Sequence, residues 1–163
     1  MPHPLFERHA PVLERALTAI AERGYWSPYS ESPSPKVYGE GAAEAGKAAF
    51  DALRDTPFAL GQPGTVGSVG REMSPYGFPL GITYPRADLA GLFAAVAEAE
   101  RGWRRAGPEA WVSVCAEILH RINRQSFLFA NAVMHTTGQS FMMAFQAGGP
   151  HAQDRGLEAV AYA

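Results

Sequence analysis

Cys115 has the strongest intrinsic nucleophile in this sequence, because a cysteine thiolate can attack a carbonyl carbon directly. It lies between Val114 and Ala116, on the apolar side of a segment with helical periodicity. A reactive thiolate needs a helix N-terminus or a cationic neighbour, and the sequence offers neither at this position. We therefore expect Cys115 to be a buried structural residue. As the only cysteine, it cannot form an intrachain disulfide.

The histidines show no spacing that would assemble a metal site, since neither an HExxH motif nor a paired His/Cys spacing occurs. The five are His3, His9, His120, His135 and His151. His135 is predicted to lie in the last turn of a helix, where a partial positive charge is favourable. His151 and Asp154 could form a catalytic pair, but such pairs are common on helix surfaces. We predict no metal ligand.

A Ser-His-Asp triad cannot be assembled from the sequence either. Nothing in it places Ser68, Ser74 or Ser140 near His151 or Asp154. The residues by themselves therefore assign no catalytic group.

Composition excludes some classes of partner. A net charge of −2 with 18% charged residues does not favour nucleic acid or anionic lipid, which attract clustered Lys and Arg. No uninterrupted run of about 20 apolar residues occurs, so no membrane span is predicted. The opening residues 1–20 mix charges and prolines with apolar side chains, unlike a signal peptide. We expect a cytoplasmic protein.

The elements that carry these side chains are predicted to be mostly helical. Apolar residues at three- and four-residue steps predict a helix over residues 5–23, closed at Gly24. Prolines interrupt the next segment, and an Ala-rich helix is predicted over residues 40–54.

Residues 57–77 are predicted to be irregular, ending in a β-turn at Ser74–Gly77. Apolar residues then alternate with smaller ones, so the best strand of the chain is predicted over residues 78–84.

From Asp88 onward the sequence predicts helix throughout. Asp88 is a suitable N-cap for a first helix, Gly107-Pro108 starts a second, and a third is predicted over residues 126–137. The apolar stripe expected in the first comprises Leu89, Leu92, Phe93, Val96 and Ala99. The buried stripe expected in the second comprises Trp111, Val114, Cys115, Ile118, Leu119 and Ile122, with Glu117, His120, Arg121 and Arg124 facing outward.

The last part of the sequence combines a soft apolar cluster with an amphipathic helix. Phe141, Met142, Met143 and Phe145 form the cluster, which is expected in the core, at an interface or in the wall of an apolar tunnel. The helix over residues 151–163 lacks a capping residue after its last periodic position, so we expect a longer polypeptide. Its apolar face and the cluster are expected to lack part of their natural cover.

Together these patterns predict a predominantly α fold with one or two short strands. The composition changes near residue 88, which divides the chain into two parts. Residues 1–87 are expected to form an N-terminal arm with two helices, Pro/Gly-rich loops and a short strand. Residues 88–163 are expected to form a helical region.

A series of motifs follows the Ala-rich helix that begins at Asp88. It comprises Trp103-Arg104, the helices over 108–124 and 126–137, the turn His135–Gln139 and the closing Ala161-Tyr162-Ala163. In the aldehyde dehydrogenase superfamily a W-R motif likewise leads into two helices, an ETGK-type turn and a Y-Y-A-like helix end, so this chain resembles that superfamily. The segments YWSPYSESPSPKVYGE, MSPYG and VMHTTGQSFMMAFQAGG are similar, more specifically, to its phenylacetic acid degradation (PaaN) subfamily. His135 and Gln139 stand where the ETGK turn has its acid and its lysine.

The resemblance implies the N-terminal part of an α/β aldehyde dehydrogenase-like fold, with residues 88–163 starting the cofactor-binding domain. The parent protein would oxidise an aldehyde or CoA-linked semialdehyde of phenylacetate catabolism with NAD or NADP. No segment matches the family's catalytic Cys, general-base Glu or dinucleotide turn, which we expect beyond Ala163. This chain alone is therefore expected to be inactive and to bind no dinucleotide, and Cys115 does not inherit the nucleophile role. The resemblance gives Asp154 and Leu157 a place at the substrate tunnel.

The implied partners are the remainder of the polypeptide, the aldehyde or acyl-CoA semialdehyde substrate, and further copies in a homo-oligomer. Nucleic acid and membranes are not expected partners. One alternative stays open on the residues alone, a non-catalytic helical module that docks a partner through the cluster at residues 141–145.

Overall fold

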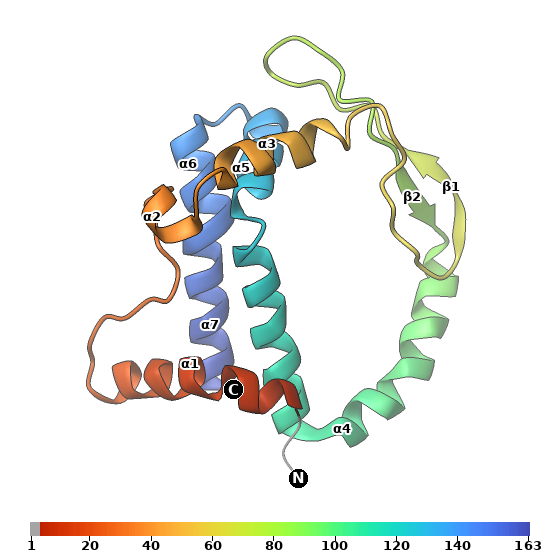
Figure 1. Ribbon diagram of the computed structural model, residues 1–163. Helices are drawn as coiled ribbons and strands as arrows, with labels where there is room; N and C mark the ends of the chain where they lie inside the picture. The colour runs from red at the N-terminus through yellow and green to blue at the C-terminus, as the bar shows by residue number, and fades with distance from the viewer. Residues whose placement is uncertain (1–3) are drawn as a thin grey trace.

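Seven α-helices and one β ribbon follow each other along residues 4–163, the part of the chain that the computed structural model describes (Figure 1). The helices are α1 (Pro4–Ala21), α2 (Pro35–Tyr38), α3 (Ala42–Asp51), α4 (Leu89–Asn123), α5 (Ser126–Thr137), α6 (Phe141–Gln146) and α7 (Ala152–Tyr162), with a π-helical segment η1 (Ala147–His151) before α7. Strands β1 (Thr65–Val69) and β2 (Tyr84–Ala87) pair antiparallel. The predicted class, predominantly α with short strands, is confirmed. No helix within these residues is long and apolar enough to cross a membrane.

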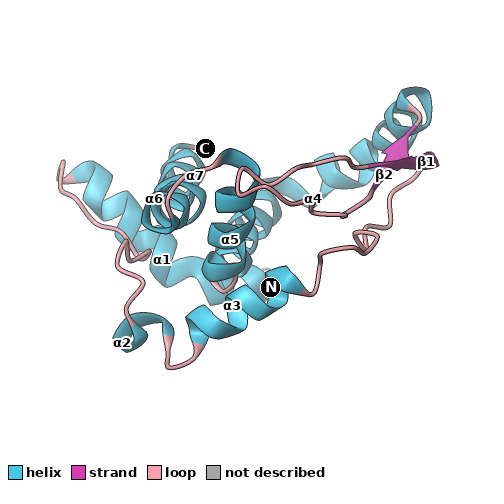
Figure 2. Ribbon diagram, turned by 90° about the horizontal axis from the view of Figure 1, so that it is seen from above, coloured by secondary structure: helices cyan, strands magenta, loops and turns pink. Residues whose placement is uncertain are grey.

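Two regions differ in how they are packed. We call α1, α3, α5, α6, α7 and residues 108–123 the helical body, and residues 89–106, the first half of α4, the projecting helix. In Figure 1 the projecting helix leaves the lower end of the helical body and curves round to the β ribbon. Figure 2 gives the same arrangement from above, with the ribbon on the far side of the molecule from α1.

The break inside α4 separates these regions, as the sequence predicted. The Asp88 carboxylate accepts a hydrogen bond from the Gly91 backbone N–H at 2.8 Å and caps the projecting helix. Gly107 has φ 80° and ψ 171°, a left-handed conformation that suits glycine and ends the helix before Pro108 restarts it. The Trp111 indole N–H donates to the Trp103 carbonyl oxygen at 2.6 Å and bridges the break.

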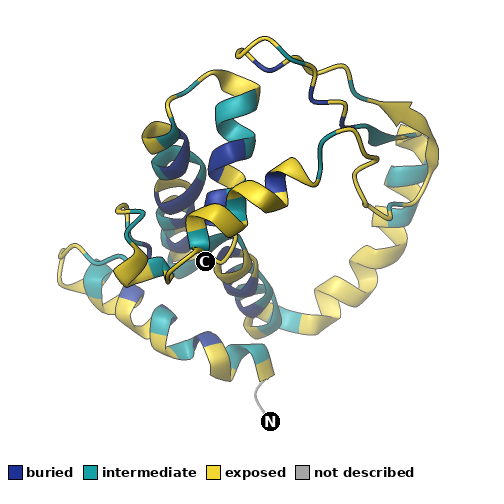
Figure 3. Cartoon of the chain, turned by 45° about the horizontal axis from the view of Figure 1, so that its top comes forward, coloured by how far each residue is buried: buried dark blue, intermediate teal, exposed yellow. Residues whose placement is uncertain are grey.

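One core of the helical body lies where α1 and α7 cross the second half of α4. Leu13 of α1, Leu119 of α4 and Leu157 of α7 are all buried there, with Ala16 and Tyr29. Figure 3 shows dark blue, buried stretches on the helices of the helical body. The prediction that the face of α7 with Leu157, Val160 and Ala161 lacks part of its cover is therefore wrong for Leu157, which α1 and α4 bury, whereas Val160 and Ala161 are only half-buried.

A second core joins α3, α5 and α6. Phe127 and Phe145 are buried with their ring centroids 5.1 Å apart, and Tyr38 meets both rings edge-on. At Gly46 of α3 a Cβ atom would overlap with the Cβ of Phe127, so only glycine permits this approach of α3 to α5. The soft apolar cluster is therefore split, because Phe145 is core whereas Met142 and Met143 are exposed on the surface.

The helices of the first half of the sequence pack on those of the second half. α1 contacts α4 and α7, and α3 contacts α5. The division at residue 88 stays a prediction about the organisation of a longer protein.

Several predicted helix ends and turns can be compared directly with the structure. α5 has the predicted bounds, ending at Gly138 with φ 78°. The predicted turn at Ser74 is confirmed, since the Gly77 N–H donates to the Ser74 carbonyl at 2.9 Å. The left-handed residue after α1 is Arg23, with φ 53°, and not Gly24.

The predicted strand over residues 78–84 is wrong except at its end. β2 begins only at Tyr84, and its partner β1 lies in the segment predicted to be irregular. Pro79 cannot donate to a ladder and Gly81 has φ 67°, so the chain between them cannot stay extended. The alternation that suggested a strand reflects burial of Leu80 and Ile82 against Phe50.

Both stripes predicted for α4 need correction. In the projecting helix Leu89, Phe93 and Val96 are exposed, so they do not form a core with the described residues. In the second half of α4 the buried positions are Ser113, Ala116, Glu117 and Leu119. Ile118 is half exposed, because α1 and α7 both pack on the side of α4 that carries Glu117 and Leu119.

Candidate functional site

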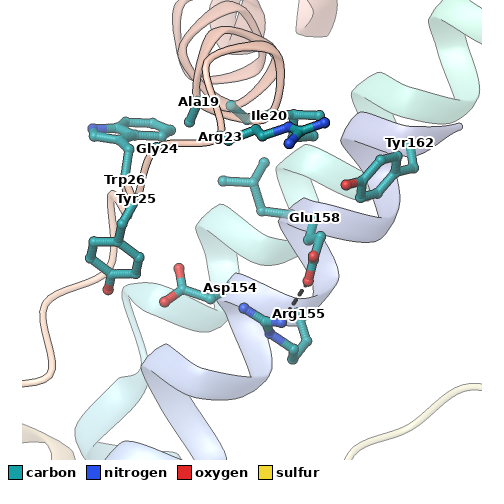
Figure 4. Close-up of a pocket in the computed structure, with 12 residues that line it drawn as sticks. Ala19, Ile20, Arg23, Gly24, Tyr25, Trp26, Asp154, Arg155, Glu158 and Tyr162 are labelled. Atoms are coloured by element: carbon teal, nitrogen blue, oxygen red, sulfur yellow. Dashed lines mark ion pairs between the residues drawn. The ribbon is translucent and has the colours of Figure 1, made fainter.

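A pocket of about 330 Å³ lies between the C-terminal end of α1 and α7 (Figure 4). Its polar and aromatic lining comes from the segment that follows α1 and from α7. These residues are Arg23, Tyr25, Trp26, Asp154, Arg155, Glu158 and Tyr162. Asp154 and Leu157, to which the resemblance gives a place at a substrate tunnel, both line this pocket, one turn apart on α7. The tunnel role itself stays a prediction.

Asp154 is the titratable group with the most distinctive surroundings in this pocket. The Ser27 hydroxyl donates to its Oδ1 atom at 2.5 Å and so fixes the carboxyl group. Burial raises the pKa of Asp154, and the Ser27 hydrogen bond partly opposes that rise. Burial, together with the charge of Asp154, also raises the pKa of the nearby Tyr29 to about 12, so this phenol stays protonated at neutral pH.

The remaining charges of the pocket are partly paired. Arg155 donates to the Glu158 carboxylate at 2.7 Å, the ion pair drawn in Figure 4. The guanidinium of Arg15 lies 4.7 Å from the centre of the Trp26 ring and supports it from the α1 side. The residues that line the pocket include no Cys, Ser or His, so this arrangement suits ligand contact and not nucleophilic catalysis.

The structure does bring one serine and one histidine together, which the sequence did not reveal. Ser74 Oγ lies 3.0 Å from His135 Nδ1, and the His135 ring stacks on Phe50 with centroids 4.9 Å apart. Burial first, and then the charge of Arg54, lowers the pKa of His135. His135 does lie in the last turn of α5, as predicted, but its surroundings favour the neutral imidazole over the positive charge expected there. Ser74 is buried and cannot reach a substrate, so the pair is structural.

A buried hydrogen-bonded contact between His9 and Glu117, which the sequence did not predict, connects α1 to α4. His9 Nε2 lies 2.8 Å from Glu117 Oε2, and Arg121 donates to the other carboxylate oxygen at 2.8 Å. The hydrogen bonds from Arg121 and then His9 lower the pKa of Glu117 to about 2. The expected outward orientation of Glu117 is wrong, since its partner comes from α1. Only one sequence signal pointed to this pair, the helical spacing of His9 with Leu13 and Ala16 on the buried face of α1.

The other candidate residues lie apart from this pocket. His151 pairs with Glu31 at 3.2 Å and not with Asp154. Cys115 is only half-buried, so its assignment to the core is corrected to the margin of the core. Within residues 4–163 no three His, Cys, Asp or Glu side chains could hold a metal ion together. His3 lies outside the described residues.

Comparison with solved structures supports the superfamily that the motifs indicated. The crystal structure of an NAD-dependent aldehyde dehydrogenase from Burkholderia multivorans matches all of this chain, with a TM-score of 0.95 and 60% sequence identity. The chain spans 29% of the length of that enzyme. No model of a known protein family matches the chain, and none of the curated proteins does. The chain is thus similar, in sequence and in fold, to part of an aldehyde dehydrogenase.

The sheet within the described residues is not of the kind at which doubly wound folds bind a dinucleotide. A dinucleotide site of that kind needs a parallel sheet with a glycine turn between a strand and the N-terminus of a helix. The sheet within residues 4–163 is two-stranded and antiparallel. We therefore assign no step through NAD to the residues of this chain.

Proposed function

We propose that this chain is the N-terminal part of an NAD-dependent aldehyde dehydrogenase, in which it serves as a helical scaffold and supplies no catalytic group. The observation that carries the proposal is the 60% identity to such an enzyme over the whole chain, at a TM-score of 0.95. The complete protein would oxidise an aldehyde to the acid through a thiohemiacetal on a cysteine that lies outside these residues.

A more specific part of the proposal concerns the substrate class. We propose an aldehyde or CoA-linked semialdehyde of phenylacetate catabolism, with NAD or NADP as cofactor, in a cytoplasmic homo-oligomer. Support comes from the subfamily-like segments, two of which have clear places in the structure. One supplies Tyr25 and Trp26 at the rim of the pocket, and the other forms the turn that carries Ser74.

The proposal can be tested with a chimera in which this chain replaces the segment of the Burkholderia enzyme that it matches. The chimera and the isolated chain are each incubated with aldehydes and NAD, and the absorbance of reduced nicotinamide is followed. We expect turnover by the chimera and none by the isolated chain. A folded chimera without turnover, or turnover by the isolated chain that Cys115→Ser abolishes, would contradict the proposal.

A second candidate is a non-catalytic helical module. The exposed side chains of Met142 and Met143 favour it, because methionine-rich surfaces adapt to irregular partners. An inactive chimera and a well-behaved isolated monomer would support this alternative.

A further inference from the structure

The projecting helix presents an apolar stripe to solvent. Leu89, Phe93 and Val96 are 68%, 73% and 64% exposed, respectively. Their spacing of four and three residues places them on one face of an α-helix. Isolated exposed apolar residues are ordinary in proteins, but three neighbours on one face form a continuous surface.

Nothing in the described part of the chain covers this stripe. The helical body packs on the second half of α4, beyond the break at Gly107, and Gly64, in the loop before β1, lies against Asp88 and Gly91 at the start of the projecting helix. Figure 3 shows most of the projecting helix in the colour of exposed residues. The opposite face carries charged residues such as Glu98, so the helix has one face suited to water and one that is not.

The position of the helix is the same where a longer chain surrounds it. This chain matches the Burkholderia enzyme along its whole length at a TM-score of 0.95, although it spans only 29% of that enzyme. The projecting helix therefore keeps its direction in a protein whose additional polypeptide is present. The large share of that enzyme that lies outside the matched segment favours the remaining polypeptide as the cover of the stripe.

We propose that Leu89, Phe93 and Val96 form a docking surface for the remainder of the complete polypeptide. This inference rests on the proposed function, because the remainder is the part of the aldehyde dehydrogenase that this chain does not span. The surface is formed in advance, since the Asp88 cap and the Trp103–Trp111 contact hold the helix in place.

Cysteine labelling of the isolated chain and of the chimera tests this surface. Both carry Cys115→Ser together with either Phe93→Cys on the stripe or Glu98→Cys on the opposite face as the matched control. Alkylation at each position is measured by peptide mass spectrometry. We expect Phe93→Cys to react about tenfold or more slowly in the chimera than in the isolated chain, because burial protects it. Glu98→Cys should react at similar rates in both.

Equal labelling of Phe93→Cys in both proteins would overturn the docking surface, as would equal protection of both positions in the chimera. Slow labelling of Phe93→Cys in the isolated chain that depends on protein concentration would assign the stripe to a second copy and also overturn it. If Phe93→Cys prevents folding, Val96→Cys reports on the same stripe. Protection in a chimera that lacks turnover would refute the proposed function and leave the docking surface standing.

Discussion

The helical body and the projecting helix carry similar amphipathic sequences but have different surroundings. In the helical body, Leu13, Leu119 and Leu157 find one another across three helices and are buried. In the projecting helix, Phe93 lies on an equally regular stripe and remains exposed. An apolar stripe therefore indicates that one face of a helix packs against other protein. It does not indicate whether that protein is part of residues 4–163.

The largest expected difference in stability is between two Phe→Ala variants, one in the helical body and one in the projecting helix. Phe145→Ala removes a fully buried ring and should lower the free energy of unfolding by about 3–5 kcal/mol. Phe93→Ala, in the isolated chain, should change it by less than about 0.5 kcal/mol. Urea denaturation of both variants measures the difference, and equal losses would mean that the projecting helix is packed in solution.

Two glycines give the next comparison. Gly46→Ala places a methyl group against Phe127 and should cost about 1–3 kcal/mol through overpacking. Gly102→Ala lies in the projecting helix with open space around it and should stabilise the chain by about 0.5–1 kcal/mol through helix propensity. Thermal unfolding should therefore shift in opposite directions, and a stabilising Gly46→Ala would show that α3 does not approach α5 so closely.

A smaller contribution to the stability of the fold, which is lost at acid pH, is expected from the ionised side chain of Glu117. Its pKa falls from 4.5 to about 2 in the folded state, so its charged form stabilises the fold above pH 4.5. That stabilisation should be lost progressively as the pH falls from about 4.5 towards 2. Glu117→Gln should lower stability at neutral pH and flatten this part of the profile, measured by denaturation at a series of pH values. An unchanged acid limb would remove the His9–Glu117 pair as a contact between α1 and α4.

The smallest change in stability is expected at the Glu100–Arg104 pair of the projecting helix, which has the same residue types and spacing as Glu117 and Arg121. Arg104 and Glu100 form an exposed pair at 2.6 Å, comparable in sequence to Arg121 and Glu117. Because water and salt screen exposed pairs, Glu100→Gln should cost no more than about 0.5 kcal/mol. The cost should vanish in about 1 M NaCl, where the screening length falls to about 3 Å. A loss that persists at high salt would indicate a buried environment for Glu100.

Sequence reasoning succeeded where the signal is local. The bounds of α5, the Asp88 cap and the break at Gly107 each follow from a few neighbouring residues. Asp154 and Leu157 share a face of α7, as expected for residues three positions apart on a helix.

It failed where a partner comes from a distant segment. His9 and Glu117 are 108 positions apart, and Ser74 and His135 are 61 apart. No periodicity in a single sequence encodes such contacts, so Glu117 reads as a solvent-facing charge and His135 as a helix cap. The predicted strand over residues 78–84 failed for a related reason, because Leu80 and Ile82 alternate to fill a core with Phe50 and not to form a sheet.

Because of the break at Gly107, a small change of angle there would move the far end of the projecting helix by a larger distance. Residues 89–106 extend roughly 27 Å at the ordinary rise per residue, so a rotation of about 10° at the break would displace the far end by about 5 Å. The hydrogen bond from the Trp111 indole to the Trp103 carbonyl and the contact between the two indole rings both oppose such a rotation at the break. The other end of the helix is tied to the helical body through the β ribbon, because Leu80 and Ile82, just before β2, pack on Phe50 of α3.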